Sequence, residues 1–285
     1  MSQKILITGK YGSLASALVP YLPENQVLTT TSRVVEHDKK CIHLNLVSAN
    51  EFDYGILDSK DIVIHMASIS APDICRNNPD LAWAVNVEGS SNFIGKCLER
   101  GAKVIFFSSD TVYAIENNNL LDEDSPCLPS EPYGRMKNEV ESRFLGEKDF
   151  TTLRLSYVIS DFDKFTVYLK KCVESNKQAE IIRAFKRSAI SFRDLVDTVL
   201  AFINRRISIP IVNICGPEIL SRMQIAEAFR ASHAPGLRLQ EIDAPDGFFE
   251  SRPPEIAVVS KYLPDILGRE PIKIADYYLQ LAQGT

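Results

Sequence analysis

Tyr133 and Lys137 are two side chains that could act together in proton transfer. They lie four residues apart in the segment "EPYGRMKNEVE", so on a helix they would share one face. A phenol can give its proton to a carbonyl oxygen, and a nearby ammonium favours the phenolate and lowers its pKa. The same spacing also occurs between unrelated surface residues. The pair therefore needs support from the rest of the chain.

Ser109 is a second candidate for chemistry. The apolar run of "VIFFSSDTVYA" ends in Ser108, Ser109 and Asp110. An α/β protein places its reactive groups where a buried strand ends, and a serine hydroxyl there can stabilise charge that develops on a carbonyl oxygen. The alternative interpretation is a capped turn, which is common for Ser-Asp pairs.

A glycine turn near the N-terminus predicts a dinucleotide site. Gly9, Gly12 and Ala15 form a G-x-x-G-x-x-A pattern between a strand, "KILIT", and a helical segment. Gly9 permits the tight turn, Gly12 lets a pyrophosphate approach the backbone, and a small residue at position 15 allows close helix packing. The helix N-terminus would add N–H groups for the phosphates. A glycine-rich β–α turn without a ligand is the alternative.

The end of the second predicted strand indicates which coenzyme binds. "QVLTTTSR" ends in Ser32 and Arg33, where an NAD site usually has an acid for the ribose 2′-hydroxyl, and Lys10 lies inside the glycine turn. A guanidinium suits a 2′-phosphate in charge and geometry. We therefore favour NADP(H) and keep NAD(H) as the alternative, in which Arg33 stacks on adenine or faces solvent.

The pattern of elements predicts an α/β fold with a doubly wound parallel sheet, a Rossmann fold. Apolar β-branched runs alternate with helical segments at 13–21, 80–99 and 134–146, which requires a sheet covered on both faces. We assign residues 1–156 to an NAD(P)-binding domain and 157–285 to a smaller substrate-binding region, with roughly 191–214 returning to the main sheet. Helices are expected at 164–176, 193–206 and 221–232, a strand at "IPIVNI", and irregular structure from His233 to Ser260.

Composition limits the function further. The chain of 285 residues has a net charge of −5 with scattered basic residues, which argues against nucleic-acid and anionic-membrane partners. Its apolar runs are too short to span a bilayer, and no signal-peptide core is visible. Six dispersed cysteines and four histidines form no metal or disulfide pattern. We expect a cytoplasmic protein with reduced, mostly buried cysteines and no bound metal.

Taken together, the motifs resemble the extended branch of the short-chain dehydrogenase/reductase superfamily. The resemblance covers nearly the whole chain in order: "TGKYGSLA", "DIVIHMAS", "AVNVEGS", "SSDTVYA", Tyr133-x-x-x-Lys137 and "LRLSYV". It implies that Ser109, Tyr133 and Lys137 are catalytic, with Lys137 also binding the nicotinamide ribose.

The resemblance also implies contacts by motif position. Asn45 stands where the family often has an aspartate contacting adenine, and Asn86 is implied to support the site geometry. The implied coenzyme-binding set is Gly9, Lys10, Tyr11, Gly12, Ser13, Leu14, Ser32, Arg33, Asn45, Leu46, Met66, Ala67, Ser68, Asn86, Ser108, Tyr133, Lys137 and Ser156. The implied substrate-binding set is Ser70, Ser109, Asp110, Thr111, Tyr157, Arg187 and Arg252.

Later segments narrow the resemblance to dTDP-4-dehydrorhamnose reductases and related NAD-dependent epimerase/dehydratase nucleotide-sugar enzymes. "VVNICGPEILSRMQIAEAF" is similar to a region of that group. "RSAISFRDL" and "SRPPEIAVVSKYLPDILG" resemble two segments that supply arginines to a nucleotide diphosphate, which implies that role for Arg187 and Arg252. Surface exposure or an ion pair between domains is the alternative for either arginine.

The reaction implied is NADPH-dependent reduction of a nucleotide-linked 4-keto(-6-deoxy) sugar, in polysaccharide biosynthesis. Related dehydratases carry an Asp-Glu pair where this chain has Asp110 and Thr111, so dehydration is disfavoured. An NAD-dependent 4-epimerase is one alternative. Another is a non-catalytic regulatory subunit, because the chain also resembles the β-subunit of methionine adenosyltransferase. Apolar faces on the helices at 80–99 and 134–146 would permit a homodimer.

Overall fold

The computed structural model describes residues 3–33, 38–113, 120–205, 207–250 and 252–284. The chain divides into two compact units, which are described separately. Unit 1 contains Met1–Val112, Cys127–Arg154 and Phe202–Val212. Unit 2 contains Tyr113–Pro126, Leu155–Ala201 and Asn213–Thr285.

Unit 1 is built on a parallel sheet. Seven strands of the described chain have the order β11-β6-β5-β4-β1-β2-β3. β1 pairs in parallel with both β2 and β4. The strand order therefore reverses at β1, which is where such sheets bind ligands. The predicted doubly wound Rossmann fold is confirmed. The strands are β1 (Ile5–Ile7), β2 (Val27–Thr31), β3 (Cys41–His43), β4 (Ile62–His65), β5 (Lys103–Ser109), β6 (Phe150–Leu155) and β11 (Ile211–Ile214).

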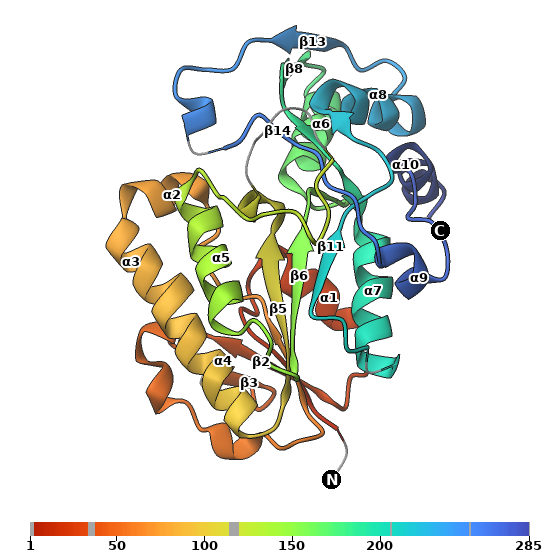
Figure 1. Ribbon diagram of the computed structural model, residues 1–285. Coiled ribbons are helices and arrows are strands. Elements are labelled where there is room, and N and C mark those ends of the chain that lie inside the picture. The colour runs from red at the N-terminus through yellow and green to blue at the C-terminus, as the bar shows by residue number, and fades with distance from the viewer. Residues whose placement is uncertain (1–2, 34–37, 114–119, 206, 251, 285) are drawn as a thin grey trace. The chain divides into compact units, whose positions relative to one another are not determined.

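Helices cover the sheet because its strands are apolar on both faces. Figure 1 shows α4 and α5 side by side to the left of β5, with α1 behind the strands. Buried side chains of α4, such as Phe93 and Ile94, join those of the strands, such as Val63 and Phe106, in one core cluster. The helices are α1 (Ser13–Leu18), α2 (Pro72–Asn77), α3 (Pro79–Trp83), α4 (Ser90–Glu99) and α5 (Pro132–Arg143), with a π-helix, η4 (Ala84–Gly89), and 3₁₀ helices η1 (Val19–Tyr21), η2 (Leu46–Glu51), η3 (Tyr54–Ile56) and η5 (Asp110–Val112).

The segment 80–99 is therefore not one regular helix. It runs through α3, η4 and α4, so the hydrogen-bond ladder changes register over "AVNVEG". Gly89 explains part of this, because a Cβ there would lie 2.3 Å from the carbonyl oxygen of Leu46. The glycine lets this helical run pass close to the η2 backbone.

Unit 2 contains small sheets and helices. The stretch His233–Ser260, expected to be irregular, in fact contributes β13 and β14, because it pairs with strands from earlier in the chain. The strands are β7 (Val158–Ile159), β8 (Ala179–Ile182), β9 (Lys186–Arg187), β10 (Ile190–Ser191), β12 (Leu220–Ser221), β13 (Leu239–Ile242) and β14 (Glu255–Ile256). The helices are α6 (Lys164–Glu174), α7 (Phe192–Arg205, which ends in unit 1), α8 (Arg222–His233), η6 (Phe248–Glu250), α9 (Leu263–Leu267) and α10 (Ile274–Gln283).

The cysteines are all free, and five of the six are buried, with Cys127 half-buried. Within the described ranges, every helix is too short or too polar to cross a lipid bilayer.

Candidate active site

Helix α5 positions the Tyr133–Lys137 pair. Pro132 occupies its first turn, where a missing N–H costs nothing. The N-cap is Glu131, whose carboxylate accepts hydrogen bonds from the backbone N–H of Tyr133 (2.8 Å) and of Gly134 (2.6 Å). Glu131 is buried, and burial raises the pKa of its carboxyl. The first turn of α5, which carries Tyr133, is thus held by a buried side chain that the sequence pattern did not identify.

Gly134 brings α5 against the end of β5. A Cβ at this position would lie 2.1 Å from the carbonyl oxygen of Thr111, closer than any real contact. Only glycine therefore allows the helix to approach the Ser109–Thr111 segment. The segment following β5 and the first turn of α5 are the two elements that form the site.

Tyr133 lies half-buried in an apolar cluster. Its ring packs against a group that includes Cys75, Met136 and Ile69. This burial raises the pKa of the Tyr133 phenol, and a hydrogen bond with Ser68 acts in the opposite direction without overcoming it. The expectation of a lowered pKa at Tyr133 was wrong, because burial outweighs the hydrogen bond with Ser68 and the carboxylates of Glu131 and Asp110 act in the same direction as burial.

Lys137 is buried beneath Tyr133 on the same helix. Its Nζ donates a hydrogen bond to the backbone oxygen of Phe107 (2.8 Å) and lies 4.6 Å from the ring centroid of Phe106 and 5.6 Å from that of Tyr133. Burial lowers the pKa of this ammonium to about 8, although the Glu141 carboxylate opposes the shift. Lys137 is therefore a cation with an unusually weak hold on its proton.

Ser109 is part of a polar group at the end of β5. Its hydroxyl donates to Asp110 Oδ1 (3.3 Å) and accepts from the Thr111 hydroxyl (3.0 Å) and backbone N–H (3.2 Å). Asp110 is buried, whereas Ser109 and Thr111 are half-buried. The structure thus brings three of the predicted site residues together in one hydrogen-bonded segment.

Asn86 supports a loop that packs against the Tyr133 cluster through Ile69. Its side chain is buried, accepts from the backbone N–H of Ile69 (2.7 Å) and donates to the backbone oxygen of the same residue (2.9 Å). These two bonds fix the loop after β4, which carries Ser68. These contacts fit the expected role of Asn86, which is to support the geometry of the site.

The glycine turn fits a dinucleotide. Gly9 has φ +81°, and a Cβ there would lie 3.1 Å from the Cα of Ala67. Gly12 is exposed and caps α1, so the backbone of the turn is open to solvent, as a bound pyrophosphate requires. Since α1 has only six residues, the turn itself rather than a long helix dipole would supply the phosphate contacts.

The cationic residues beside this turn differ in their contacts. The guanidinium carbon of Arg33 lies 4.8 Å from the ring centroid of Tyr11, and both side chains are exposed. Lys10 instead forms a salt bridge with Asp38, which raises the pKa of the lysine and lowers that of the aspartate. A 2′-phosphate would have to compete with Asp38 for Lys10. Arg33 is therefore the more accessible cation for that phosphate.

A buried relay that sequence reasoning missed links the ends of β1 and β4. The Thr8 hydroxyl accepts from the backbone N–H of Met66 and of Ala67 (both 2.9 Å) and contacts His65 Nδ1 (3.0 Å). His65 Nε2 contacts the hydroxyl of Ser90 (3.0 Å), which itself donates to Val85. Burial and the Lys137 ammonium lower the pKa of His65 to about 3, so the ring is neutral. The sequence feature that could have indicated this relay is the histidine inside the apolar strand "DIVIH".

Other predicted coenzyme residues have varied surroundings. The Ser108 hydroxyl donates to Glu141, which also pairs with the buried Arg154 (2.6 Å). Asn45 caps η2 through Val47 (3.2 Å). Of the rest, Leu46 and Ser156 are buried, Leu14, Met66 and Ala67 are half-buried, and Ser13, Ser32 and, from the substrate set, Ser70 are exposed.

The predicted substrate residues of unit 2 have identifiable partners. The Tyr157 hydroxyl donates to Asp163 Oδ1 (3.1 Å). Arg187 is buried and donates to three backbone oxygens, those of Lys186 (2.7 Å), Pro253 (2.6 Å) and Pro254 (3.1 Å). Arg252 is half-buried, with its guanidinium 5.1 Å from the ring centroid of Phe248.

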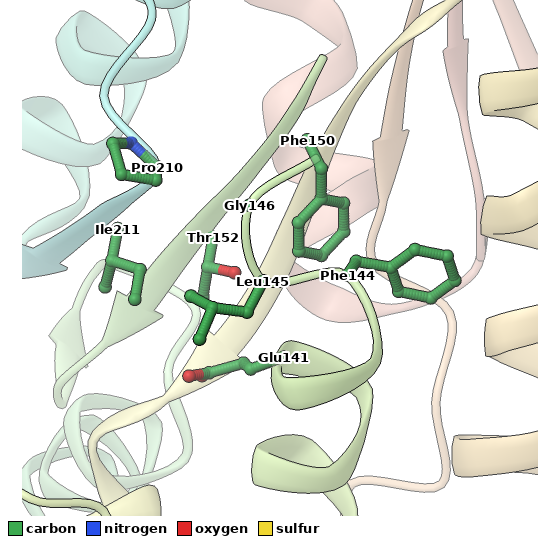
Figure 2. A pocket seen from close by; sticks show the side chains of 8 residues that line it. All are labelled: Glu141, Phe144, Leu145, Gly146, Phe150, Thr152, Pro210 and Ile211. Carbon is green, nitrogen blue, oxygen red and sulfur yellow. The ribbon is translucent and has the colours of Figure 1, made fainter. Parts of the chain in front are cut away.

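A pocket in unit 1 is lined by residues of α5, of the segment that follows it, and of β6 and β11. Figure 2 shows it beside Glu141, near the C-terminal end of α5, while Tyr133 occupies the first turn of that helix. Its lining is largely apolar and includes Phe144, Leu145 and Phe150. The pocket contains none of the predicted site residues.

Comparison with known proteins defines the family. The family model described as "RmlD substrate binding domain" matches residues 3–257, so the chain belongs to this family. It thereby also falls within the dTDP-4-dehydrorhamnose reductase-like group that its motifs resemble.

Several individual proteins are similar to this chain in sequence or in structure. "Methionine adenosyltransferase 2 subunit beta" of Bos taurus is 26% identical over 216 residues, which is 73% of this chain and 64% of the relative, so the chain spans less than two thirds of that protein. The protein of the same name from Xenopus laevis is 30% identical over 261 residues, covering 86% of this chain and 77% of the relative. A solved structure described as a hypothetical dTDP-4-dehydrorhamnose reductase from Sulfolobus tokodaii superposes with a TM-score of 0.81 at 22% identity, covering 96% of this chain and 99% of that one.

Proposed function

We propose that this protein is an NADPH-dependent oxidoreductase that reduces the 4-keto group of a nucleotide-linked sugar. The observation that carries the proposal is the placement of Ser109, Tyr133 and Lys137 on two contacting elements, in the same unit as a glycine turn that fits a dinucleotide. Membership of the RmlD substrate-binding family supports a nucleotide sugar as the substrate.

When bound, NADPH would supply the hydride for the carbonyl carbon. Tyr133 donates the proton to the carbonyl oxygen, and its raised pKa keeps the phenol protonated at neutral pH. Ser109 donates a hydrogen bond to the same oxygen as negative charge develops. The ammonium of Lys137 then stabilises the phenolate that remains after proton transfer.

Coenzyme preference is proposed from the residues beside the glycine turn. Arg33 can match a 2′-phosphate with two hydrogen bonds, and no acid stands at the end of the β2 segment "VLTTTSR" to hold a ribose hydroxyl. We therefore favour NADPH over NADH. The homodimer and the cytoplasmic location stay predictions from the sequence.

A regulatory subunit is the second candidate, since the chain is 30% identical to a protein named as the β-subunit of a methionine adenosyltransferase. Such a subunit would bind a coenzyme and a partner protein without turnover. The set of Ser109, Tyr133 and Lys137 favours the enzyme, because a binding module has no need of a proton donor.

The deciding experiment is calorimetric titration with NADPH and NADH, followed by a screen of dTDP-, UDP-, GDP- and CDP-linked 4-keto sugars for coenzyme oxidation. We expect tighter binding of NADPH, weakened in Arg33→Ala, and turnover that Tyr133→Phe abolishes while binding persists. NADPH binding without turnover of any sugar would favour the regulatory subunit. NAD that copurifies with the protein would favour the epimerase, and binding of neither coenzyme would refute the dinucleotide site.

A further inference from the structure

Three arginines of unit 2 alternate with two phenylalanines. Phe185 has the guanidinium of Arg187 at 4.2 Å from its ring centroid and that of Arg222 at 4.3 Å. Phe248 has Arg222 at 5.8 Å and Arg252 at 5.1 Å. Arg222 thus lies between the two rings and is the central cation of this group, which we call the arginine–phenylalanine cluster.

The pairing of three short strands creates the cluster. β9, which contains Arg187, pairs with β12 on one side and β14 on the other. Arg222 directly follows β12, and Arg252 lies three residues before β14. Residues from three separate parts of the sequence are therefore placed side by side by the register of this small sheet.

The hydrogen bonds of Arg187 indicate a structural role. Three donated bonds to backbone oxygens occupy most of its N–H groups, and the side chain is buried. These bonds join β9 to the segment Pro253–Pro254 that leads into β14. Of the two arginines that the family resemblance assigns to a diphosphate, Arg187 thus already donates most of its N–H groups to the backbone.

Arg222 differs from Arg187 in its hydrogen bonds and ion pairs. Its Nε is buried and has no hydrogen-bond partner among the described residues, and its guanidinium pairs with no described carboxylate. Asp163 acts on it electrostatically, but the oxygens of that carboxylate already accept bonds from Tyr157, from the backbone of Ser160 and from the first turn of α6. Burial and the neighbouring Arg252 both disfavour its charge. An unpaired, partly desolvated guanidinium is what an incoming anion would stabilise.

We propose that Arg222, together with Arg252, binds the diphosphate of the nucleotide substrate, and that Arg187 has a structural role instead. The proposal rests on the proposed nucleotide-sugar function and assigns the residues that recognise the substrate. Two guanidiniums on one phenylalanine ring suit two adjacent phosphate groups, and each presents a planar fork of donors to phosphate oxygens.

The test is calorimetric titration of the full-length protein, saturated with NADPH, with UDP, dTDP, GDP and CDP. We expect Arg222→Met to weaken binding of the preferred nucleotide by about tenfold or more, with partial recovery in Arg222→Lys. Arg230→Met, a half-buried arginine on the same helix, is the matched control and should bind like the wild type.

Thermal unfolding separates binding from folding. Without nucleotide, Arg222→Met should unfold at the wild-type temperature or higher, because it removes an unpaired charge, whereas Arg187→Met should unfold at a lower temperature. Unchanged affinity in Arg222→Met, or binding of none of the four nucleotides by the wild type, would overturn the proposal. Nucleotide binding that depends on Arg222 in a protein that reduces no keto sugar would refute the reductase and leave this assignment standing.

Discussion

At the residue scale, burial determines how firmly the two central groups of the site, Tyr133 and Lys137, hold their protons. Tyr133 keeps its proton more firmly than a free tyrosine, and Lys137 keeps its proton less firmly than a free lysine. Both shifts arise mainly from burial, which favours the neutral form of each group. Of the two groups, Lys137 is therefore the one whose charge changes near physiological pH.

This difference predicts the pH dependence of reduction. Tyr133 stays protonated as the pH rises, whereas Lys137 loses its proton near pH 8. We expect kcat/KM to fall by roughly tenfold per pH unit above that value, because the ammonium that stabilises the phenolate is lost. Steady-state rates between pH 6 and 10 measure this. Lys137→Met should be slow and lack the fall near pH 8, and a wild-type profile that stays flat to pH 10 would contradict the prediction.

Lys137 also predicts a stability change in the same pH range. Its pKa is lowered on folding, so between pH 8 and the ordinary lysine pKa of 10.5 the unfolded chain binds more protons than the folded protein. The contribution of Lys137 to the free energy of unfolding therefore rises with pH across this window. Urea titrations at pH 7.5 and 9.5 should show a larger rise for the wild type than for Lys137→Met. An equal rise would place the pKa of Lys137 elsewhere.

At the scale of elements, helix α5 is secured at both ends. Glu131 holds its first turn, and Glu141, near its last turn, pairs with Arg154 of β6 in a buried salt bridge. The spacing of Tyr133 and Lys137 could be predicted from the sequence because both lie on one helix. The cap was missed because glutamate is not among the residues preferred at an N-cap, whereas the salt bridge and the contact with Thr111 depend on tertiary packing and could not be predicted.

Glu131→Ala should show how much the cap contributes. We expect a loss of about 1–2 kcal/mol in the free energy of unfolding and a lower kcat, because two N–H groups beside Tyr133 lose their acceptor. Asp53→Ala, which removes the cap of η3 in the same unit, should lower stability without lowering kcat. Equal effects of the two variants on kcat would show that the cap has no role in placing Tyr133.

Two helical glycines provide a matched comparison. Alanine usually stabilises a helix by up to about 1 kcal/mol relative to glycine. At Gly95 a Cβ would meet only the ring of Phe144 at 3.9 Å, so Gly95→Ala should be neutral or stabilising. At Gly134 it would collide with Thr111, so Gly134→Ala should unfold at lower urea and lose activity. Stability gained in both variants would mean that α5 does not pack as described.

At the scale of the whole molecule, the proposed ligand sites belong to different compact units. The glycine turn lies in unit 1, and the arginine–phenylalanine cluster lies in unit 2. Hydrogen exchange should therefore show NADPH protecting amides near Gly9–Gly12 and UDP, or the preferred nucleotide, protecting β9, β12 and β14. Protection of the same amides by both ligands would contradict separate sites.

The two units also differed in how far they could be predicted from the sequence. Strands such as β4 and β5 are continuous apolar runs, so each carries its own signal. β8 and β13 instead depend on each other, with Ala179 paired to Leu239, and such pairing over distant segments leaves no local pattern. The position of Arg222 depends on the same kind of pairing, so its neighbours became apparent only in the folded protein.

The buried relay at His65 also makes this residue a spectroscopic reporter. Thr8 accepts two N–H bonds and must donate to Nδ1, while Ser90 donates to Val85 and must accept from Nε2. A single tautomer with its proton on Nε2 follows. In a nitrogen–proton NMR spectrum, this imidazole N–H should give one slowly exchanging resonance that does not move between pH 5 and 8. Its disappearance would signal the opening of the sheet at the point where β1 and β4 meet, before any loss of activity is measured.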